Sequence, residues 1–415
     1  MEFIADFHIH SKYSRATAHN MDLEALDYWA KIKGIKVLGT GDFTHPEWLK
    51  NLKEKLEPAE PGLFKLKSNK GETRFILTSE ISCIYSKNNR VRKVHIVVFA
   101  PSFEAVEKIN AQLGWIGNLK SDGRPILGLD VKELAKIVLS ASENCLVVPA
   151  HAWTPWFSVF GSKSGFDSLE ECFEDFTKYI FAIETGLSSD PGMNWRLSAL
   201  DKITLISNSD AHSPQKIGRE ANVFDTEISY PAIYEAIKNK DPKKFLYTIE
   251  FFPEEGKYHF DGHRNCNITL SPQESKKYNN VCPNCQRLLT IGVLNRVEDL
   301  ADRPENFKPE NAIPYKSLIP LEEIIADALG VLPGAKKVEE EYQKLIKNFG
   351  SEFNVLLKVD PREIESATLP EVGEGVKKVR AGQVFIRPGY DGVYGKIKIF
   401  SKEEKIDKAK QGFLF

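Results

Sequence analysis

The residues best suited to chemistry begin near the N-terminus, where two histidines alternate along a short apolar segment. Residues 3–10 read FIADFHIH and include His8 and His10. On a β-strand, residues i and i+2 point to the same face, about 7 Å apart, so both rings could bind one metal ion. Two imidazoles alone could equally be polar side chains at the end of a strand.

Further histidines and carboxylates recur at the ends of other apolar segments, and this recurrence favours the metal interpretation. Each one lies inside or just after a segment of apolar residues. They are Asp42, His45, Glu80, His95, His151, Asp210 and His212. A chance distribution of the nine histidines would not produce this pattern.

Three metal positions can be built from these groups. The first has His8, His10, Glu80 and Asp210 as ligands, the second has Glu80 as a bridge with His95 and His151, and the third has His212 and Asp42, with His45 as a further candidate. Such ligand sets suit Zn²⁺ or Mn²⁺, with Mg²⁺ as an alternative. Metals about 3.5–4 Å apart hold phosphoryl oxygens and acidify a bound water. The expected reaction is hydrolysis of a phosphoester, with Asp210, Glu80 and His151 as catalytic residues.

The cysteines predict a second, structural metal site. Three of the six lie among apolar neighbours and are expected to be reduced thiols, namely Cys83, Cys145 and Cys172. The others follow the pattern H-x2-C-x15-C-x2-C, formed by His263, Cys266, Cys282 and Cys285. Four ligands from two tight turns suit tetrahedral zinc, and a closed four-ligand site is structural. His259 is an alternative fourth ligand.

Length and charge set the wider limits. A chain of 415 residues is expected to hold two or three domains. The net charge of −2 gives no sign of nucleic-acid binding, so any DNA contact requires a local basic patch. Apolar segments are far shorter than the about 20 residues of a membrane span, and no signal peptide is visible. We therefore expect a cytoplasmic protein without membrane association.

The elements that must position these groups alternate between strands and helices over residues 1–255. Expected strands, after the first at the N-terminus, cover 35–38, 75–80, 93–99, 145–149, 180–184 and 203–207, and expected helices cover 21–33, 46–56, 102–113 and 130–141. Repeated units of this kind predict a parallel sheet or barrel, whose functional groups lie at the C-terminal ends of strands. Residues 57–71 are expected to be a loop.

The rest of the chain differs in composition. Residues 256–302 are expected to be a zinc-binding domain, and 303–415 a linker, a helical region and a C-terminal tail. Within that part, 303–320 reads as a linker or an extended arm, 321–330 and 335–348 as helices, and 379–400 as a small β-hairpin or meander.

Taken as a set, the HxH start, Asp42, Glu80, His95, His151 and the final DxH resemble the polymerase-and-histidinol-phosphatase (PHP) family of metal phosphoesterases. The resemblance implies a distorted (β/α)7 barrel with a trinuclear metal centre. The chain departs from the family pattern at Arg15 and at Asp42-Phe43, where the family often has a further ligand and an Asp-His pair. His45 is the candidate replacement.

The barrel, the zinc motif and the helical tail together resemble the endonuclease Q family, and the segments 184–196 and 387–395 strengthen this resemblance. It implies an archaeal or bacterial, nucleoid-associated DNA-repair endonuclease that cuts on the 5′ side of uracil, hypoxanthine, xanthine and abasic sites. One alternative is a small-molecule phosphatase of the histidinol-phosphatase kind, which would not need the extra domains. Another is a DNA-binding module without activity, which would not need the retained ligands.

Several residues are predicted to contact DNA. Arg90 and Arg92 lie in a basic turn that could hold phosphates or simply be solvated. Trp153 and Trp156 lie in an aromatic loop that could wedge a duplex, stack on an extruded base, or pack in the core. Arg196 is a further candidate within the segment 184–196.

The last residues resemble the short peptides that bind a sliding clamp (PCNA). Gln411 precedes an apolar end that contains Leu414 and Phe415. In such peptides the glutamine caps a pocket and the apolar side chains fill it. Docking of the tail on the same chain is the alternative.

Overall fold

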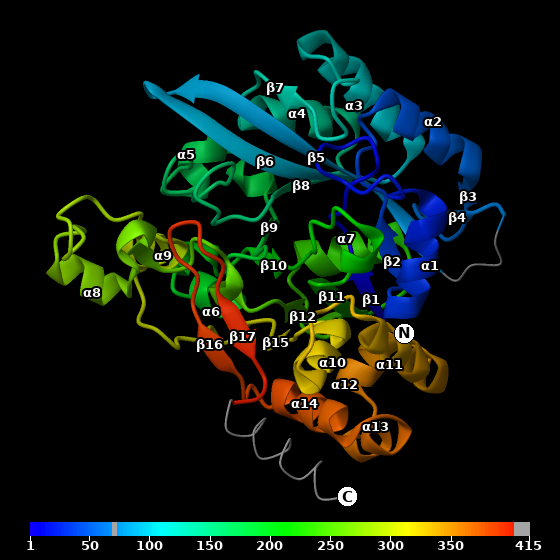
Figure 1. Cartoon of the computed structure of the whole chain (residues 1–415). Helices are drawn as coiled ribbons and strands as arrows, with labels where there is room; N and C mark the ends of the chain where they lie inside the picture. Colours follow the sequence, from blue (N-terminus) through cyan, green and yellow to red (C-terminus); the bar gives the residue numbers. More distant parts are fainter. Residues whose placement is uncertain (69–72, 402–415) are drawn as a thin grey trace, which may run out of the picture.

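The structure is a computed structural model that describes residues 1–68 and 73–401 (Figure 1). Its centre is an eleven-stranded sheet in which β1 lies between β11 and β2, and the long strand β5 continues the sheet to β6 and β8. The strands are β1 (Glu2–Asp6), β2 (Val37–Gly39), β3 (Leu56–Pro58), β4 (Phe64–Leu66), β5 (Arg74–Lys87), β6 (Arg90–Ala100), β7 (Ile126–Leu127), β8 (Leu146–Pro149), β11 (Ala221–Asp225), β12 (Phe245–Glu250) and β15 (Tyr315–Ser317).

The register of β1 explains how the barrel is built. Ala5 pairs with Val37 of the parallel strand β2, whereas Phe3 pairs with Phe224 of the antiparallel strand β11. A separate parallel pair, β9 (Ala182–Glu184) and β10 (Thr204–Ile206), lies beside β8. The mixture of parallel and antiparallel pairs is the expected distortion, and the predicted α/β barrel is confirmed.

The interior of the barrel is filled by aromatic and aliphatic side chains. The ring of Phe7 lies 5.3 Å from that of Phe99 and 6.0 Å from that of Phe224, centroid to centroid. These rings belong to a buried cluster that also contains Ile76 and Val148. The packed interior leaves the ends of the strands as the place where polar groups can gather.

Helices cover the outside of this sheet. They are α1 (Leu23–Lys33), α2 (Pro46–Lys55), α3 (Phe103–Ile116), α4 (Val131–Ala141), α5 (Leu169–Phe173), α6 (Pro191–Asn194) and α7 (Tyr230–Lys238), with 3-10 turns η1 (Glu174–Tyr179), η2 (Ser198–Leu200) and η3 (Pro214–Lys216). Three of the longer helices start at side-chain caps, since Asp22, Ser102 and Asp130 each accept a hydrogen bond from a first-turn N–H. Gly34, in a left-handed conformation, ends α1.

Long-range pairing produces strands where the sequence predicts none. The expected loop 57–71 contains β4 and most of β3, and the expected linker 303–320 contains β15, which pairs with β12. Strands β5 and β6 extend beyond their predicted ends into a long hairpin. In each case the partner strand supplies hydrogen bonds that local sequence does not reveal.

Two further groups of elements flank the barrel (Figure 1). The C-terminal helices are α10 (Leu321–Leu329), α11 (Lys336–Phe349), α12 (Glu352–Leu357), α13 (Pro361–Ala367) and α14 (Pro370–Arg380), of which the last three were not predicted. The elements around the cysteines are η4 (Pro253–Glu255), β13 (Asp261–His263), η5 (Arg264–Cys266), β14 (Ile268–Leu270), α8 (Pro272–Lys277) and α9 (Val293–Leu300), beside the hairpin of β16 (Phe385–Arg387) and β17 (Lys396–Lys398). Among the described helices, none is both long and apolar enough to cross a bilayer.

A buried ion pair joins the C-terminal helices to the barrel. Lys33 at the end of α1 lies 2.6 Å from Glu352 on α12, and both side chains are largely buried. The Tyr342 hydroxyl donates a hydrogen bond of 2.6 Å to the same carboxylate, and so does the Leu321 N–H at 3.1 Å. Glu352 is therefore fully hydrogen-bonded at the seam between the two parts.

Candidate metal centres and adjoining cavity

The strand ends bring the predicted ligands into two overlapping sets. Ligand atoms of His8, His10, Glu80 and Asp210 all lie within 4.8 Å of one another, as do those of Glu80, His95 and His151. The first set forms partly because the chain after β1 lies beside the chain after β10, where the His10 N–H donates to the Ala211 carbonyl at 3.0 Å.

Glu80 has the geometry of a bridging carboxylate. Its Oε2 lies 3.2 Å from His10 Nε2 and 3.5 Å from His8 Nε2. Its Oε1 lies 2.6 Å from His95 Nδ1 and 3.1 Å from His151 Nε2. One carboxylate therefore faces both ligand sets, with one oxygen directed to each.

His8 provides a test of whether a cation fits the first set. Its Nδ1 lies 3.0 Å from both carboxylate oxygens of Glu184, so it carries the proton and donates it to that side chain. Its Nε2 is buried and has no hydrogen-bond partner within the described residues. That lone pair points toward Glu80 and Asp210, whose oxygens lie 3.5 and 3.6 Å away. An orphaned imidazole nitrogen facing two carboxylates is the arrangement expected of a divalent cation site.

The electrostatics agree with this reading. Burial lowers the pKa of His8, but the surrounding carboxylates, Glu184 foremost, have the larger opposite effect. The pKa of His8 therefore lies well above its usual value. Burial raises the pKa of Glu80, but the charges of His95 and Arg124 hold it well below its usual value. The pKa of Asp210 is likewise lowered, because His8 and His10 outweigh its burial. The pocket thus favours positive charge between ionised carboxylates.

The backbone at three residues of the site is held in an uncommon conformation. Asp42, His151 and Asp210 have φ values of 49°, 30° and 47°. Gly186 packs so closely that a Cβ there would lie 2.5 Å from the Cβ of His151. Non-glycine residues at positive φ cost free energy and persist where surrounding structure fixes them, which is common at functional sites.

The residues of the predicted third metal position make different contacts in the described structure. Asp42 Oδ1 lies 3.0 Å from His10 Nδ1, and its Oδ2 accepts hydrogen bonds from Ser11 and Ser14, so Asp42 orients the His10 ring from behind. His45 stacks on Tyr13 instead, with centroids 4.4 Å apart. The His212 ring lies 4.6 Å from that of His10, and its Nδ1 donates to the Asp210 carbonyl. Within the described residues they form no third ligand set.

Two polar residues of the site were not among the predicted site residues. Glu184 accepts hydrogen bonds from His8, from the His151 N–H at 2.8 Å and from Asn208 at 2.9 Å. Its position at the end of an expected strand was the available signal. Arg124 Nη1 donates to Glu80 Oε2 at 3.0 Å, yet it comes from an irregular segment that gave no signal.

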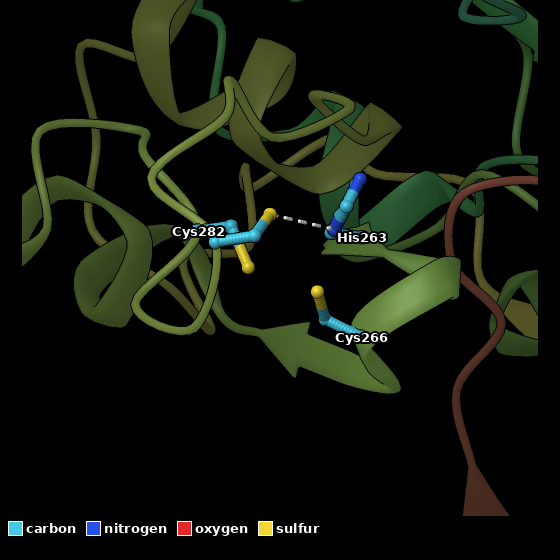
Figure 2. A group of neighbouring side chains, drawn as sticks. His263, Cys266 and Cys282 are labelled. Atoms are coloured by element: carbon cyan, nitrogen blue, oxygen red, sulfur yellow. Dashed lines mark hydrogen bonds between the residues drawn. The ribbon is translucent and has the colours of Figure 1, made fainter.

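The predicted zinc ligands lie together (Figure 2). Ligand atoms of His263, Cys266, Cys282 and Cys285 all lie within 4.8 Å of one another, and Cys285 Sγ is 3.4 Å from His263 Nδ1. Burial raises the pKa of Cys282, but the Cys285 and Asn284 N–H groups lower it to about 7. His259 is buried and lies outside this set, and burial lowers its pKa to about 4. A tetrahedral zinc fits three thiols and one imidazole.

A cavity of about 390 Å³ adjoins the metal-ligand sets, because His151 and Asp210 form part of its wall. Its other lining residues include four aromatic side chains, Trp156, Phe251, Tyr258 and Tyr394. The ring of Trp156 is 41% exposed and lies 5.8 Å from that of Tyr258. The cavity can accept a flat, ring-shaped group next to the ligands.

The structure corrects three predicted DNA contacts. Trp153 is 1% exposed, and its indole N–H donates to Asn194, so the core-packing alternative applies to it. Arg92 is buried over the ring of Phe166, and Arg196 is buried and paired with Glu298. These three side chains are fixed inside the protein and offer no surface to DNA.

The other residues predicted to contact DNA or a clamp are not fixed inside the protein or lie outside the described residues. Arg90 is exposed where β6 begins, at the turn of the long hairpin, and Trp156 opens to the cavity. Gln411, Leu414 and Phe415 lie outside the described residues.

Comparison with known proteins gives matches over nearly the whole chain. A crystal structure of a lesion-specific endonuclease, PfuEndoQ from Pyrococcus furiosus, is 32% identical with a TM-score of 0.86, covering 98% of this chain and 99% of that one. Endonuclease Q bound to a 27-mer duplex, with an abasic lesion at its active site, has a TM-score of 0.84 at 32% identity, covering 98% of each chain.

Three further matches are shorter or more distant. The MJ0043 C-terminal domain family matches residues 320–383. The uncharacterized protein MJ0043 of Methanocaldococcus jannaschii is 34% identical over 268 residues, which is 62% of this chain but only 32% of that protein. The uncharacterized YqxK of Bacillus subtilis is 29% identical over 88% of this chain and 89% of its own length.

The fold and the two metal-ligand sets together define a metal-dependent hydrolase built on a mixed α/β barrel. With 32% identity maintained over the full length of a solved relative, the chain belongs to the endonuclease Q family.

Proposed function

We propose that this protein is a DNA-repair endonuclease that hydrolyses the phosphodiester on the 5′ side of deaminated bases and abasic sites. The observation that carries the proposal is that His151 and Asp210 belong both to the metal-ligand sets and to the wall of the aromatic cavity. A base held in the cavity would place its own backbone phosphates beside the ligands. The abasic lesion at the active site of endonuclease Q supports the same assignment.

Two ligand sets would hold the catalytic cations. His8, His10, Glu80 and Asp210 would hold one, and Glu80, His95 and His151 the other, with Zn²⁺, Mn²⁺ or Mg²⁺ as the ion. Bound divalent cations supply charge that stabilises phosphoryl oxygens and lowers the pKa of water. No serine or cysteine nucleophile is then required.

The protein's own groups prepare this site for a phosphodiester. Glu184 fixes the tautomer of His8, and Asp42 fixes the ring of His10, so each directs its Nε2 to the ligand set. Arg124 lies against Glu80 with 26% of its side chain exposed, which allows it to bind a phosphate oxygen. Most of the ligands are buried, and the low local dielectric strengthens these interactions.

The aromatic cavity would hold the base. A nuclease that recognises a damaged base within a duplex must first extrude it, at a cost that is lowest for mispaired or missing bases. Trp156 and Tyr258 provide rings on which an extruded base can stack. Arg90, exposed on the β5–β6 hairpin, would bind backbone phosphate farther away.

The remaining predictions complete the proposal. The zinc site has four protein ligands and therefore a structural role. Gln411, Leu414 and Phe415 would form a sliding-clamp (PCNA) peptide, which a pull-down with and without residues 411–415 can test.

The decisive experiment uses an end-labelled duplex with one deoxyuridine, one deoxyinosine or one abasic site, in Mg²⁺, Mn²⁺ or Zn²⁺. We expect a single nick on the 5′ side of the lesion, leaving 3′-hydroxyl and 5′-phosphate ends, and loss of nicking in Asp210→Asn. Glu133→Gln is the matched control, since Glu133 is an exposed carboxylate on α4. Turnover of p-nitrophenyl phosphate or histidinol phosphate faster than nicking would favour the small-molecule phosphatase instead, and DNA binding without nicking in any metal would favour the inactive DNA-binding module.

A further inference from the structure

The turn between β16 and β17, residues 388–395, is the part of the 387–395 motif that no function described so far uses. It lies against the segment 254–257, of which residues 255–257 line the cavity. Three of its glycines bind that segment: the Gly389 N–H donates to the Glu254 carbonyl, that of Gly392 to Lys257, and that of Gly395 to Glu255, at 2.8 to 3.0 Å.

The glycines are needed for this close approach. A Cβ at Gly395 would overlap the Glu254 carbonyl oxygen, and Gly392 has a φ of 82°. The turn is thus fixed to the cavity wall through its backbone.

The same turn is fixed to the zinc-binding elements through Asp391. Its Oδ2 accepts the Arg264 N–H at 2.7 Å, directly after the zinc ligand His263, and its Oδ1 accepts the Thr290 hydroxyl at 2.6 Å. Its neighbour Tyr390 is buried and donates its hydroxyl to Asn267, directly after the ligand Cys266. Two residues of the turn therefore hold the chain directly after each of the first two zinc ligands.

Tyr394, three residues after Asp391, lines the cavity. Its side chain is 67% exposed, and the Lys257 ammonium lies 5.3 Å from its ring. The aromatic wall of the cavity thus comes from distant parts of the chain: Trp156 and Phe251 follow barrel strands, Tyr258 precedes the zinc ligands, and Tyr394 belongs to the turn.

We propose that Tyr394 stacks on the base extruded into the cavity, and that Asp391 is a positioning residue through which the zinc-binding elements set the place of Tyr394. This inference rests on the proposed function. It gives the zinc site a role in recognising the damaged base in addition to holding the fold. It also means that a residue near the C-terminus, Tyr394, contacts the base in the cavity.

The first test compares Tyr394→Ala and Tyr394→Phe on two duplexes, one with deoxyuridine and one with an abasic site. Loss of stacking on a base typically weakens binding affinity by about 5- to 150-fold. We expect Tyr394→Ala to raise KM for the uracil duplex within this range with little change in kcat, and Tyr394→Phe to behave like the unchanged protein. The abasic duplex has no base to stack, so its KM should hardly change. An equal change on both duplexes, or no change on either, would overturn the stacking role.

The second test concerns Asp391. We expect Asp391→Ala to keep its zinc, measured with a chromogenic chelator after denaturation, and yet to raise KM selectively for the uracil duplex. Its effect and that of Tyr394→Ala should be less than additive in the double variant, because both act through one ring. Full additivity, or an effect equal on both duplexes, contradicts the positioning role. If Asp391→Ala does not fold, Thr290→Val removes one of the two contacts and carries the same expectation.

Binding separates this inference from the proposed function. Fluorescence anisotropy with the two duplexes measures the preference for an extruded base without any nicking. If the unchanged protein nicks neither duplex, the proposed function fails, while a uracil preference that Tyr394→Ala abolishes would still support the stacking role. If the protein nicks lesions but Tyr394→Ala keeps the uracil preference, only this inference fails.

Discussion

Replacing Glu184 by glutamine tests how the metal-ligand sets are organised, because Glu184 coordinates nothing itself yet touches three groups of the site. It accepts hydrogen bonds from His8 Nδ1 at 3.0 Å, from the His151 N–H at 2.8 Å and from the Asn208 amide at 2.9 Å. A glutamine has one acceptor oxygen and places an N–H₂ group against one of these donors. The His8 ring then loses the carboxylate that fixes its tautomer.

The magnitude follows from this arrangement. Loss of a group that orients a metal ligand typically lowers metal affinity or activity by about 10- to 100-fold, which corresponds to about 1.4 to 2.7 kcal/mol. Because one carboxylate serves His8 and also the backbone of His151, we expect the upper part of this range. The effect should appear as weaker binding of metal and as a higher metal concentration required for nicking.

Manganese is the suitable probe, since electron paramagnetic resonance measures free Mn²⁺ directly. Glu250→Gln is the matched control: Glu250 is also buried and accepts a hydrogen bond from Thr185, next to Glu184. Burial raises the pKa of Glu250 to about 8, so glutamine replaces a carboxyl that is already largely protonated at neutral pH. An unchanged Mn²⁺ affinity in folded Glu184→Gln, or an equal loss in Glu250→Gln, would refute the orienting role.

Three further predictions concern stability. Cys285→Ser should bind less zinc and melt at a lower temperature than the unchanged protein, and equal zinc content by chelator assay would contradict the four-ligand site. Glu352→Gln should cost about 3–5 kcal/mol in chemical denaturation because it leaves Lys33 buried without a carboxylate, whereas the double variant with Lys33→Met should recover part of that loss. A carboxyl whose folded pKa is raised contributes stability below its unfolded pKa and loses it as pH rises through the folded value. For Glu250 the free energy of unfolding should therefore fall by about 1.4 kcal/mol per pH unit. This fall should span about pH 4.5 to 8 and flatten in Glu250→Gln; an identical slope in both proteins would show that another group is responsible.

The ligands could be predicted because strand ends are local features of sequence. His8, Glu80 and Asp210 each lie at or just after a run of apolar residues, and a barrel carries such ends to one edge. The zinc ligands were likewise visible in their spacing. Arg124 was not, because it comes from an irregular segment whose position depends on the folded barrel.

Exposure was the harder quantity to predict. Trp153 and Trp156 lie three residues apart in one aromatic loop, yet the first is 1% and the second 41% exposed. Their residue type is the same, so only the packing of the loop decides which ring can meet a ligand. Asp42 shows the same limit, since its role in orienting His10 depends on distances of about an ångström that no spacing encodes.

His151 and Asp210, which both have positive φ angles, lie where the metal-ligand sets meet the cavity. Both residues ligate in the proposed centres and line the cavity, and both hold a strained backbone conformation. A residue that turns sharply after its strand can direct its side chain to the metal while its neighbours face the cavity. Because these two residues would ligate the cations beside the phosphate and also line the cavity that holds the base, a displaced base would misplace the phosphodiester as well. Recognition of the lesion and hydrolysis are therefore expected to fail together in variants that change the backbone at His151 or Asp210. In variants of Tyr394, recognition of the base is expected to weaken while hydrolysis is retained.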